Sequence, residues 1–172
     1  MTDPRAELRA KQGAGARYDA AQAPAEDLLL ARRGTAFLAR KINELDDRSL
    51  DKGTRRRTIA RICYEARAQA EAIAALRAGG GAATTLPEAS EQDIAEGVTL
   101  PARALRHLFH HTCVHLNVEW RDLSDSEWQL NLPNGTPVMS LPLIRARSVW
   151  RASLDLANGT RAADIPAKLR DH

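Results

Sequence analysis

The stretch RSVWRASLDL, residues 147–156, has the spacing of a metal-binding helix but not its residue types. Ser148 and Ala152 are four residues apart and Asp155 follows three later, so an α-helix places all of them on one face. Helices that hold a metal ion often present two ligands four residues apart, with an acid nearby. Because neither serine nor alanine supplies such a ligand here, the purpose of this face is the first question that the sequence raises.

A row of histidines is the second candidate for metal chemistry. His107, His111 and His115 recur every four residues, and two histidines at that spacing can share a metal ion. We find no carboxylate in this row, so the pattern favours packed or surface histidines over a metal site. Cys113 lies in the same helical pattern and Cys63 in an earlier one. We interpret both as small core thiols, not as nucleophiles.

The overall charge gives no indication of a nucleic-acid partner. Lysine and arginine number 25 against 22 acids, a net charge of +3 in 172 residues. The RRR run at residues 55–57 has no interleaved aromatic residues, which is typical of a solvated helix face. No stretch approaches the ~20 apolar residues of a membrane span, and the polar N-terminus does not resemble a signal peptide. We therefore expect a cytoplasmic protein with no nucleic-acid or membrane partner.

The elements that must position these residues are helical. Aromatic residues make up only 4% of the chain, while alanine, leucine and arginine, which are strong helix formers, are abundant. Residues 1–25 are polar and predict a loosely ordered arm. Apolar residues at helical spacing predict helices over residues 26–45, 54–77 and 99–121, and the glycines that begin the stretch 79–90 predict a loop there.

The last part of the chain predicts a short β-hairpin and a fourth helix. Residues 128–141 alternate in polarity around an Asn-Gly pair, which is typical of a hairpin. The fourth helix is predicted from Leu141 to Asn158-Gly159, with an apolar stripe of Leu143, Ala146, Trp150, Leu154 and Ala157. Residues 26–172 thus predict one all-α domain, a four-helix bundle with one long crossover.

Four segments, in this order, resemble a known family: LLLARRGTAFLARKINELDDRSL, TRRRTIARICYEA, QDIAEGVTLPARALRHLFHHTCVHLNVEWRDLS and RARSVWRASLDLANGTRAADIPAKL. Over about residues 26–170 the chain is similar to the thiol-dependent maleylpyruvate isomerases of the DinB-like (YfiT-like) superfamily. The resemblance implies a four-helix bundle and an enzyme that uses glutathione or mycothiol to isomerise maleylpyruvate to fumarylpyruvate. It also implies a divalent metal, usually zinc, held by one histidine of the second helix and by a glutamate and a histidine of the fourth.

The chain departs from the family at each of these ligand positions. The second-helix pattern T-R-x-H-x-x-A-H-x-x-Y-N-A is written TRRRTIARICYEA here, so the ligand histidine falls on Arg61. The fourth-helix pattern R-E-V-W-x-H-A-V-D-L is written RSVWRASLDL, so the glutamate falls on Ser148 and the histidine on Ala152. The resemblance also leads us to expect that the family's C-terminal α/β domain is missing. The departures imply that no metal is bound.

Arg61 offers a reading of the altered site. Facing Ser148, it would keep the positive charge of the lost metal, and Arg147 and Arg151 would reinforce it. A guanidinium pairs with a carboxylate through two hydrogen bonds, so the expected partner is a small carboxylated metabolite. Asp155 would orient the arginines or act as a base. Under this hypothesis Arg61 and Asp155 are catalytic, and Arg61, Arg147, Ser148 and Arg151 bind substrate.

Other readings of the same residues remain open. The face that carries Ser148, Ala152 and Asp155 could simply be solvated, since the predicted apolar stripe lies nearly opposite. The chain could be a non-catalytic binding, regulatory or self-resistance protein, with a homodimer covering that face. It could also be a transferase that retains affinity for glutathione or mycothiol. No cofactor is expected beyond such a thiol.

Overall fold

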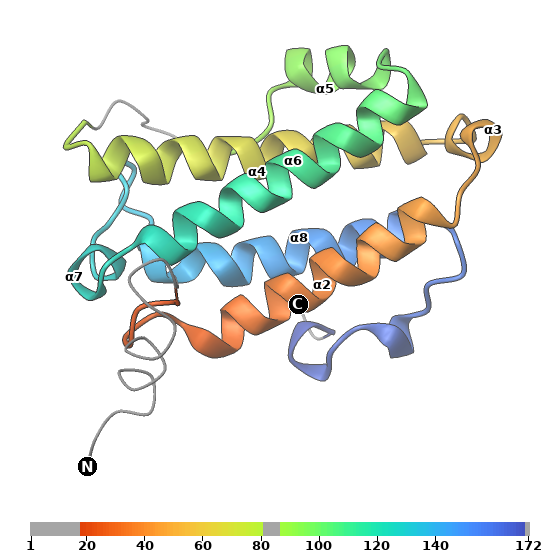
Figure 1. The fold of residues 1–172 in the computed structure, drawn as a ribbon. Coiled ribbons are helices and arrows are strands. Elements are labelled where there is room, and N and C mark those ends of the chain that lie inside the picture. Colours follow the sequence, from red (N-terminus) through yellow and green to blue (C-terminus); the bar gives the residue numbers. More distant parts are fainter. Residues whose placement is uncertain (1–17, 81–86, 171–172) are drawn as a thin grey trace.

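The computed structural model describes residues 18–80 and 87–170, and within them the secondary structure is helical with no strand (Figure 1). The all-α prediction is confirmed. Most of the predicted N-terminal arm, residues 1–17, lies outside the described residues. Four long helices dominate the fold: α2 (Ala25–Asn43), α4 (Arg55–Arg77), α6 (Ala102–Asp122) and α8 (Leu141–Asp155).

The four long helices form two layers, with α4 beside α6 and α2 beside α8 (Figure 1). The layers meet where α4 packs against α8, while α2 and α6 touch over a smaller area. The core between the layers consists of buried aliphatic residues from all four helices, among them Leu38, Ile62, Leu105 and Val149. This arrangement leaves two lateral junctions, α4 with α8 and α2 with α6, at opposite sides of the core.

Gly34 allows α2 and α8 to approach closely. A Cβ atom at this position would lie 2.6 Å from both Trp150 Nε1 and Val149 Cγ2, closer than real Cβ atoms come. The absence of a side chain therefore lets Trp150 lie flat against α2, where its indole N–H donates to the Leu30 carbonyl at 3.1 Å. This contact fixes how α8 presents its opposite side to α4.

The structure contains three short helices that the sequence analysis did not anticipate: α3 (Asp47–Leu50), α5 (Glu91–Val98) and α7 (Asp125–Trp128). Each begins after a side chain that caps its first turn: Asp46, Ser90 and Ser124. Helices of four residues are too short to show a hydrophobic period, and α5 has little more than two turns. For such elements the cap is the clearest sequence signal.

The β-hairpin predicted over residues 128–141 is not confirmed. A turn is present, but its only β pairing is an isolated bridge between Asn131 and Pro137, beside a hydrogen bond from Leu132 N to Thr136 O of 2.8 Å. Pro133 and Pro137 have no N–H group to donate, so a regular ladder cannot form. The chain enters a 3-10 turn, η1 (Val138–Ser140), immediately afterwards.

The buried face of α8 is rotated from the predicted stripe. The helix ends at Asp155, before the predicted stop, and Ala157 adopts a left-handed conformation with φ 48° and is exposed. Ala146 and Trp150 of the predicted stripe are buried, and Arg145, Val149 and Ala152 are buried beside them. The second part of α8 thus packs on α2 through one side and on α4 through the other, and the predicted solvated face is wrong at Ala152, whose exposure is 0%.

After α8 the chain returns along the outside of α2 and α8 through two 3-10 turns, η2 (Ala162–Asp164) and η3 (Ala167–Leu169) (Figure 1). Ile165 and Leu169 bury their side chains in this return. Among the described residues, no helix is both long enough and apolar enough to cross a membrane.

Candidate functional site at the junction of α4 and α8

Arg61 of α4 meets Ser148 of α8 where the two helices cross. The Arg61 Nη1 group donates to the Ser148 hydroxyl oxygen at 3.3 Å, so the structure brings these two predicted site residues together. Ala152, one turn further along α8, is completely buried, and its small side chain accommodates the close packing of α4 on α8. We call Arg61, Glu65, Ser148, Ala152 and Asp155 the α4–α8 face.

Glu65 is the centre of the α4–α8 face. Its carboxylate accepts from Arg61 Nη1 through Oε1 at 2.7 Å, and it accepts a hydrogen bond from the Ser148 hydroxyl through Oε2. Arg61 and Glu65 are separated by four residues, a spacing that allows ion pairs along one helix. The Glu65 side chain is only 18% exposed, so its ion pair is screened less than a surface pair. The guanidinium, hydroxyl and carboxylate therefore satisfy one another.

Asp155 closes the same network at the end of α8. Its carboxylate lies 3.8 Å from Arg61 Nη2 and 3.3 Å from Arg151 Nε. An acid at a helix C-terminus lies in the negative end of the helix dipole, so these two arginines offset an unfavourable position. Asp155 is held as a partner of arginines, with Arg61 between it and Glu65.

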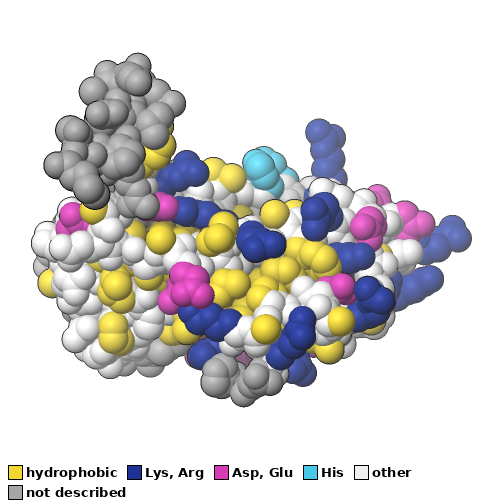
Figure 2. Space-filling view, turned by 90° about the horizontal axis from the view of Figure 1, so that it is seen from below, with side chains coloured by type: hydrophobic (Ala, Val, Ile, Leu, Met, Phe, Trp, Pro, Cys, Tyr) yellow, Lys and Arg dark blue, Asp and Glu magenta, His cyan; other side chains and the backbone are white. Residues whose placement is uncertain are grey.

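Arg147 does not join this group. It is exposed and lines a separate hollow of about 540 Å³, which it shares with Arg151, Trp150, Leu154 and residues of the C-terminal return. Figure 2 views the molecule from below and shows apolar side chains on this side, bordered by lysine and arginine side chains. Of the predicted site residues, the structure brings together Arg61, Ser148, Arg151 and Asp155, and it places Arg147 elsewhere.

Two hollows open beside the Arg61 guanidinium. One, of about 220 Å³, is lined by Glu65, Gln69 and Ser148, with residues that precede α5 on its other side. The second, of about 300 Å³, is lined by Asp155, Thr58 and neighbouring residues of α4. The side-chain amide oxygen of Gln69 is buried and has no hydrogen-bond partner among the described residues. Arg61 is thus reachable from two directions, and one of its hollows is lined by a residue whose buried side-chain oxygen is unsatisfied.

Arg145 is the most informative residue that the sequence analysis missed. Its side chain is almost fully buried, its Nη1 group donates to the Ile62 carbonyl at 2.9 Å, and the same group lies 3.8 Å from Glu65 Oε2. Two guanidinium groups, those of Arg61 and Arg145, therefore share one glutamate. The contact of Glu65 with Arg61 could have been predicted from their spacing of four residues. The burial of Arg145 could not, because α8 carries several arginines and nothing in the sequence distinguishes this one.

The two cysteines differ in their surroundings. Cys63 is fully buried, and burial raises the pKa of its thiol to about 12. Cys113 is half-buried and accepts a hydrogen bond from Arg145 Nη2 at 3.5 Å. Burial raises the pKa of the Cys113 thiol, although Arg145 acts in the opposite direction. Both groups are therefore held as neutral thiols, which is the form expected of cysteines that are not nucleophiles.

The histidine row lies on the outside of α6. His107 and His111 stack with ring centroids 6.3 Å apart, and His115 Nε2 lies 3.4 Å from Glu119 Oε1. The sequence analysis was wrong that no carboxylate joins this row, because Glu119 continues it by one more turn. Among the described residues, no three His, Cys, Asp or Glu side chains are grouped so that they could hold a metal ion.

The RRR run was also misjudged as a purely solvated face. Arg55 donates from Nε to the Leu156 carbonyl at 2.7 Å and from Nη2 to the Ala157 carbonyl at 3.0 Å. It therefore caps the C-terminal end of α8 and positions the helix that carries Ser148. Arg57, by contrast, is exposed and pairs with Glu91 at the surface.

Known proteins share this fold and part of this sequence. The family model of the mycothiol maleylpyruvate isomerase N-terminal domain matches residues 31–157. Two crystal structures, of the mycothiol-dependent maleylpyruvate isomerase and of a histidine-to-alanine mutant of that enzyme, each match with 29% identity and a TM-score of 0.73. Each match covers 85% of this chain and 65% of the other, so the chain spans slightly less than two thirds of their length. No curated protein matches the chain. Because the family model covers most of its length, the chain belongs to the mycothiol maleylpyruvate isomerase N-terminal domain family.

Proposed function

We propose that this chain is a metal-independent relative of the maleylpyruvate isomerases that binds a small carboxylated metabolite at the α4–α8 face. The observation that carries the proposal is the position of Arg61, whose guanidinium borders two hollows while it contacts Ser148 on the opposite helix. Arg61 is the anchor for a substrate carboxylate, and Asp155 orients it. Any isomerisation of the bound acid would rely on these side chains.

The donor set at this face does not fit the metal of the related enzymes. The positions that the family pattern gives to ligands hold Arg61, Ser148 and Ala152. A guanidinium has no lone pair for a metal ion, and an alanine has no ligand atom. The serine hydroxyl already donates a hydrogen bond to Glu65. No step of the proposed function therefore uses a metal ion.

Local charge supports the binding of an anion. The hollow of about 220 Å³ has Arg61 against Glu65, Glu88 and Glu91, but the hollow of about 300 Å³ has Arg57 and Arg61 against Asp155 alone. One substrate carboxylate would balance the charge of the second hollow. A guanidinium forms two parallel hydrogen bonds with a carboxylate, and such charged hydrogen bonds are worth about 1.5–3 kcal/mol. Small dicarboxylates and 2-oxo acids match the size of the hollows.

Binding can be measured by titration calorimetry with succinate and pyruvate. We expect Arg61→Ala to weaken binding by about 1.5–3 kcal/mol, which is roughly 10- to 150-fold. Arg103→Ala is the matched control, because this arginine of α6 is exposed and borders neither hollow. If neither acid binds, or if both variants lose the same affinity, the proposal fails. Addition of a chelator should leave the binding unchanged.

A thiol cofactor is the second candidate ligand, since both matched structures are of a mycothiol-dependent enzyme. Glutathione would place its carboxylates near the same arginines, whereas mycothiol, which has no carboxylate, would contact them through its hydroxyl and amide groups. The test is calorimetry with each thiol, followed by an assay for maleylpyruvate isomerisation with and without the thiol. Isomerisation only in the presence of the thiol would assign an enzyme, and binding without turnover would assign a binding protein.

A further inference from the structure

The second lateral junction, between α2 and α6, contains a groove that the α4–α8 face does not use. Its volume is about 270 Å³, near the lower end of small-molecule pockets. Apolar side chains form its walls, including Ala39 of α2 and Phe109, Val114 and Trp120 of α6. We call this hollow the α2–α6 groove. Because α2 and α6 pack less extensively than the other helix pairs, the groove is built into the bundle.

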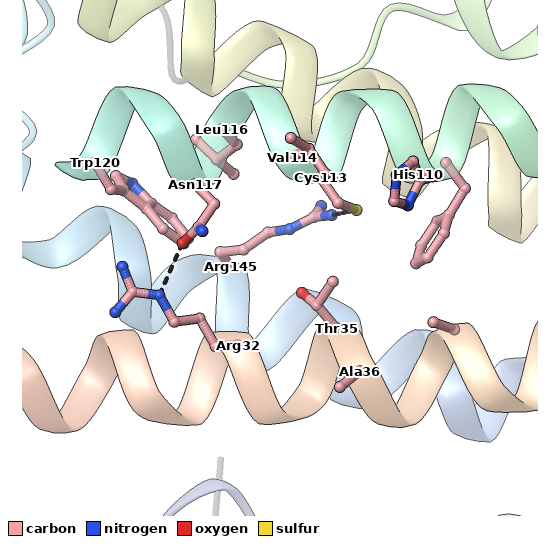
Figure 3. Close-up of a pocket in the computed structure, with 12 residues that line it drawn as sticks. Arg32, Thr35, Ala36, His110, Cys113, Val114, Leu116, Asn117, Trp120 and Arg145 are labelled. Carbon is pink, nitrogen blue, oxygen red and sulfur yellow. Dashed lines mark hydrogen bonds between the residues drawn. The ribbon is translucent and has the colours of Figure 1, made fainter. Parts of the chain in front are cut away.

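Arg145 supplies a positive charge deep in this groove. Figure 3 shows its side chain reaching from α8 between the two helices, with the guanidinium beside Cys113. The guanidinium has five N–H donors, of which one bonds to the Ile62 carbonyl and one to the Cys113 sulfur, a weak acceptor. No further hydrogen bond joins it to a described residue. Its nearest carboxylate, Glu65, lies 3.8 Å away and is shared with Arg61 and Ser148.

The other arginine of the groove is already satisfied. Arg32 forms a two-pronged ion pair with Asp19, at 2.5 and 2.7 Å, and donates from Nε to Asn117 at 2.8 Å. It therefore closes one end of the groove as a neutral cluster, and its contact with Asn117 is drawn in Figure 3. The groove consequently combines apolar walls, one closed end and a single buried guanidinium whose donors are incompletely used. Thr35 extends from α2 toward that guanidinium and adds a hydroxyl (Figure 3).

We propose that the α2–α6 groove binds a small monocarboxylic acid with an apolar body, such as an aromatic ring, and that its carboxylate pairs with Arg145. A buried guanidinium that shares its carboxylate with a second one is costly, and an anion in the groove removes that cost. Phe109, Val114 and Trp120 bury the apolar body. The groove opens on the opposite side of the core from the α4–α8 face, while its Arg145 also lies near Glu65, and this proposal does not rest on the function proposed for that face.

Calorimetry with benzoate and 3-phenylpropanoate tests the proposal, with benzamide as the uncharged control. We expect both acids to bind at least 10-fold more tightly than benzamide. Arg145→Met should weaken both acids at least 10-fold, whereas Arg147→Met, two residues away on α8 and exposed, should change them less than 2-fold. Equal affinity for benzoate and benzamide, or unchanged binding in Arg145→Met, overturns the proposal.

Two further measurements keep the test decisive if Arg145→Met does not fold. Ala39→Leu narrows the groove from the α2 side and leaves Arg145 in place, so it should weaken the acids at least 10-fold. Cys113 borders the groove while Cys63 is fully buried, so saturating benzoate should slow iodoacetamide modification of Cys113 at least 3-fold. Benzoate binding that neither responds to Ala39→Leu nor protects Cys113 places the acid elsewhere and overturns the proposal.

Discussion

The α4–α8 face and the α2–α6 groove both depend on arginine, but their arginines have different partners. On the α4–α8 face Arg61 contacts two carboxylates and a hydroxyl, so its charge is largely balanced within the protein. In the α2–α6 groove the Arg145 guanidinium has a carbonyl and a thiol as its hydrogen-bond partners. On the α4–α8 face a bound acid would compete with Glu65 and Asp155 for Arg61, whereas the groove is an apolar hollow with an under-used charge.

Glu65 connects the two regions, because it lies between Arg61 and Arg145. A carboxylate bound in the groove would draw Arg145 toward itself and leave Glu65 more fully to Arg61. A carboxylate bound at Arg61 would have the reverse effect. The number of arginines in a region is therefore a poor indicator of anion binding. The number of N–H donors that a guanidinium has left unpaired is a better one.

The largest expected effect comes from restoring the family's ligand types on the α4–α8 face. The variant Arg61→His, Ser148→Glu, Ala152→His places two nitrogen ligands and one carboxylate where α4 and α8 meet. We expect one equivalent of zinc with a Kd of about 1 μM or tighter, a gain of about 8 kcal/mol that elemental analysis and calorimetry will detect.

The single variant Arg61→His is the control for this experiment, and it should hold no stoichiometric zinc. Because Ala152 is completely buried, the new histidine must displace some packing between α4 and α8. If the triple variant folds and holds no zinc, the two helices no longer have the spacing that a shared metal needs. The α4–α8 face would then be an ordinary packing contact between two helices that no longer has the geometry of a metal site.

Removal of the shared carboxylate should have the next largest effect. Glu65→Gln leaves Arg61 and Arg145 without their common negative partner, and we expect a loss of about 2–4 kcal/mol in the free energy of unfolding. This is below the loss for a fully buried pair, because the Glu65 side chain keeps 18% exposure. Urea unfolding measures the change. Glu88 is an exposed acid that lines the hollow of about 220 Å³ together with Glu65. Glu88→Gln should change the free energy of unfolding by less than about 0.5 kcal/mol.

A double variant separates the contributions of the two arginines. If Arg145 is the more dependent partner, adding Arg145→Met to Glu65→Gln should recover at least about 1 kcal/mol, because an unpaired buried charge is removed. Strict additivity of the two changes would show that Glu65 serves Arg61 alone. The coupling between the two regions would then be absent.

The long helices were predictable from the sequence, and the site was predictable only in part. The starts of α4 and α8 and the end of α6 follow apolar periodicity and fall within a residue or two of the expected positions. The meeting of Arg61 with Ser148 followed from the family pattern, which pairs those positions as ligands of one metal. Apolar periodicity predicts the positions of the long helices because each of them buries a stripe of apolar residues over several turns.

What the sequence could not show depends on tertiary contacts. Arg145 is buried because the groove between α2 and α6 leaves room for its guanidinium, and its neighbours in the chain look like those of the exposed Arg147. Ala152 is completely buried in the packing of α8, and the close approach of α8 to α2 depends on the absence of a side chain at Gly34. The predicted hairpin was outweighed by two prolines that cannot donate to a ladder.

A side chain at Gly34 should disturb both regions through α8. Gly34→Ala places a methyl group 2.6 Å from Trp150 and Val149, so one helix must shift. Overpacking of this kind costs about 1–3 kcal/mol, although the better helix propensity of alanine returns about 1 kcal/mol. We expect a net loss of up to about 2 kcal/mol in thermal or urea unfolding. At Gly80 the nearest atom to a new Cβ is 3.7 Å away, and Gly80→Ala should be nearly neutral.

The smallest effect distinguishes a capping arginine from a surface arginine in the same run. Arg55→Ala removes two hydrogen bonds to the carbonyls of Leu156 and Ala157, just after the end of α8, at 2.7 and 3.0 Å, and a third to the Ser49 carbonyl at 2.9 Å. Because Arg55 is half-exposed, we expect a loss of about 1–1.5 kcal/mol in urea unfolding. Arg57→Ala removes only a surface ion pair with Glu91 and should cost less than about 0.5 kcal/mol. Equal losses would mean that the end of α8, and with it Asp155, is held by packing and not by Arg55.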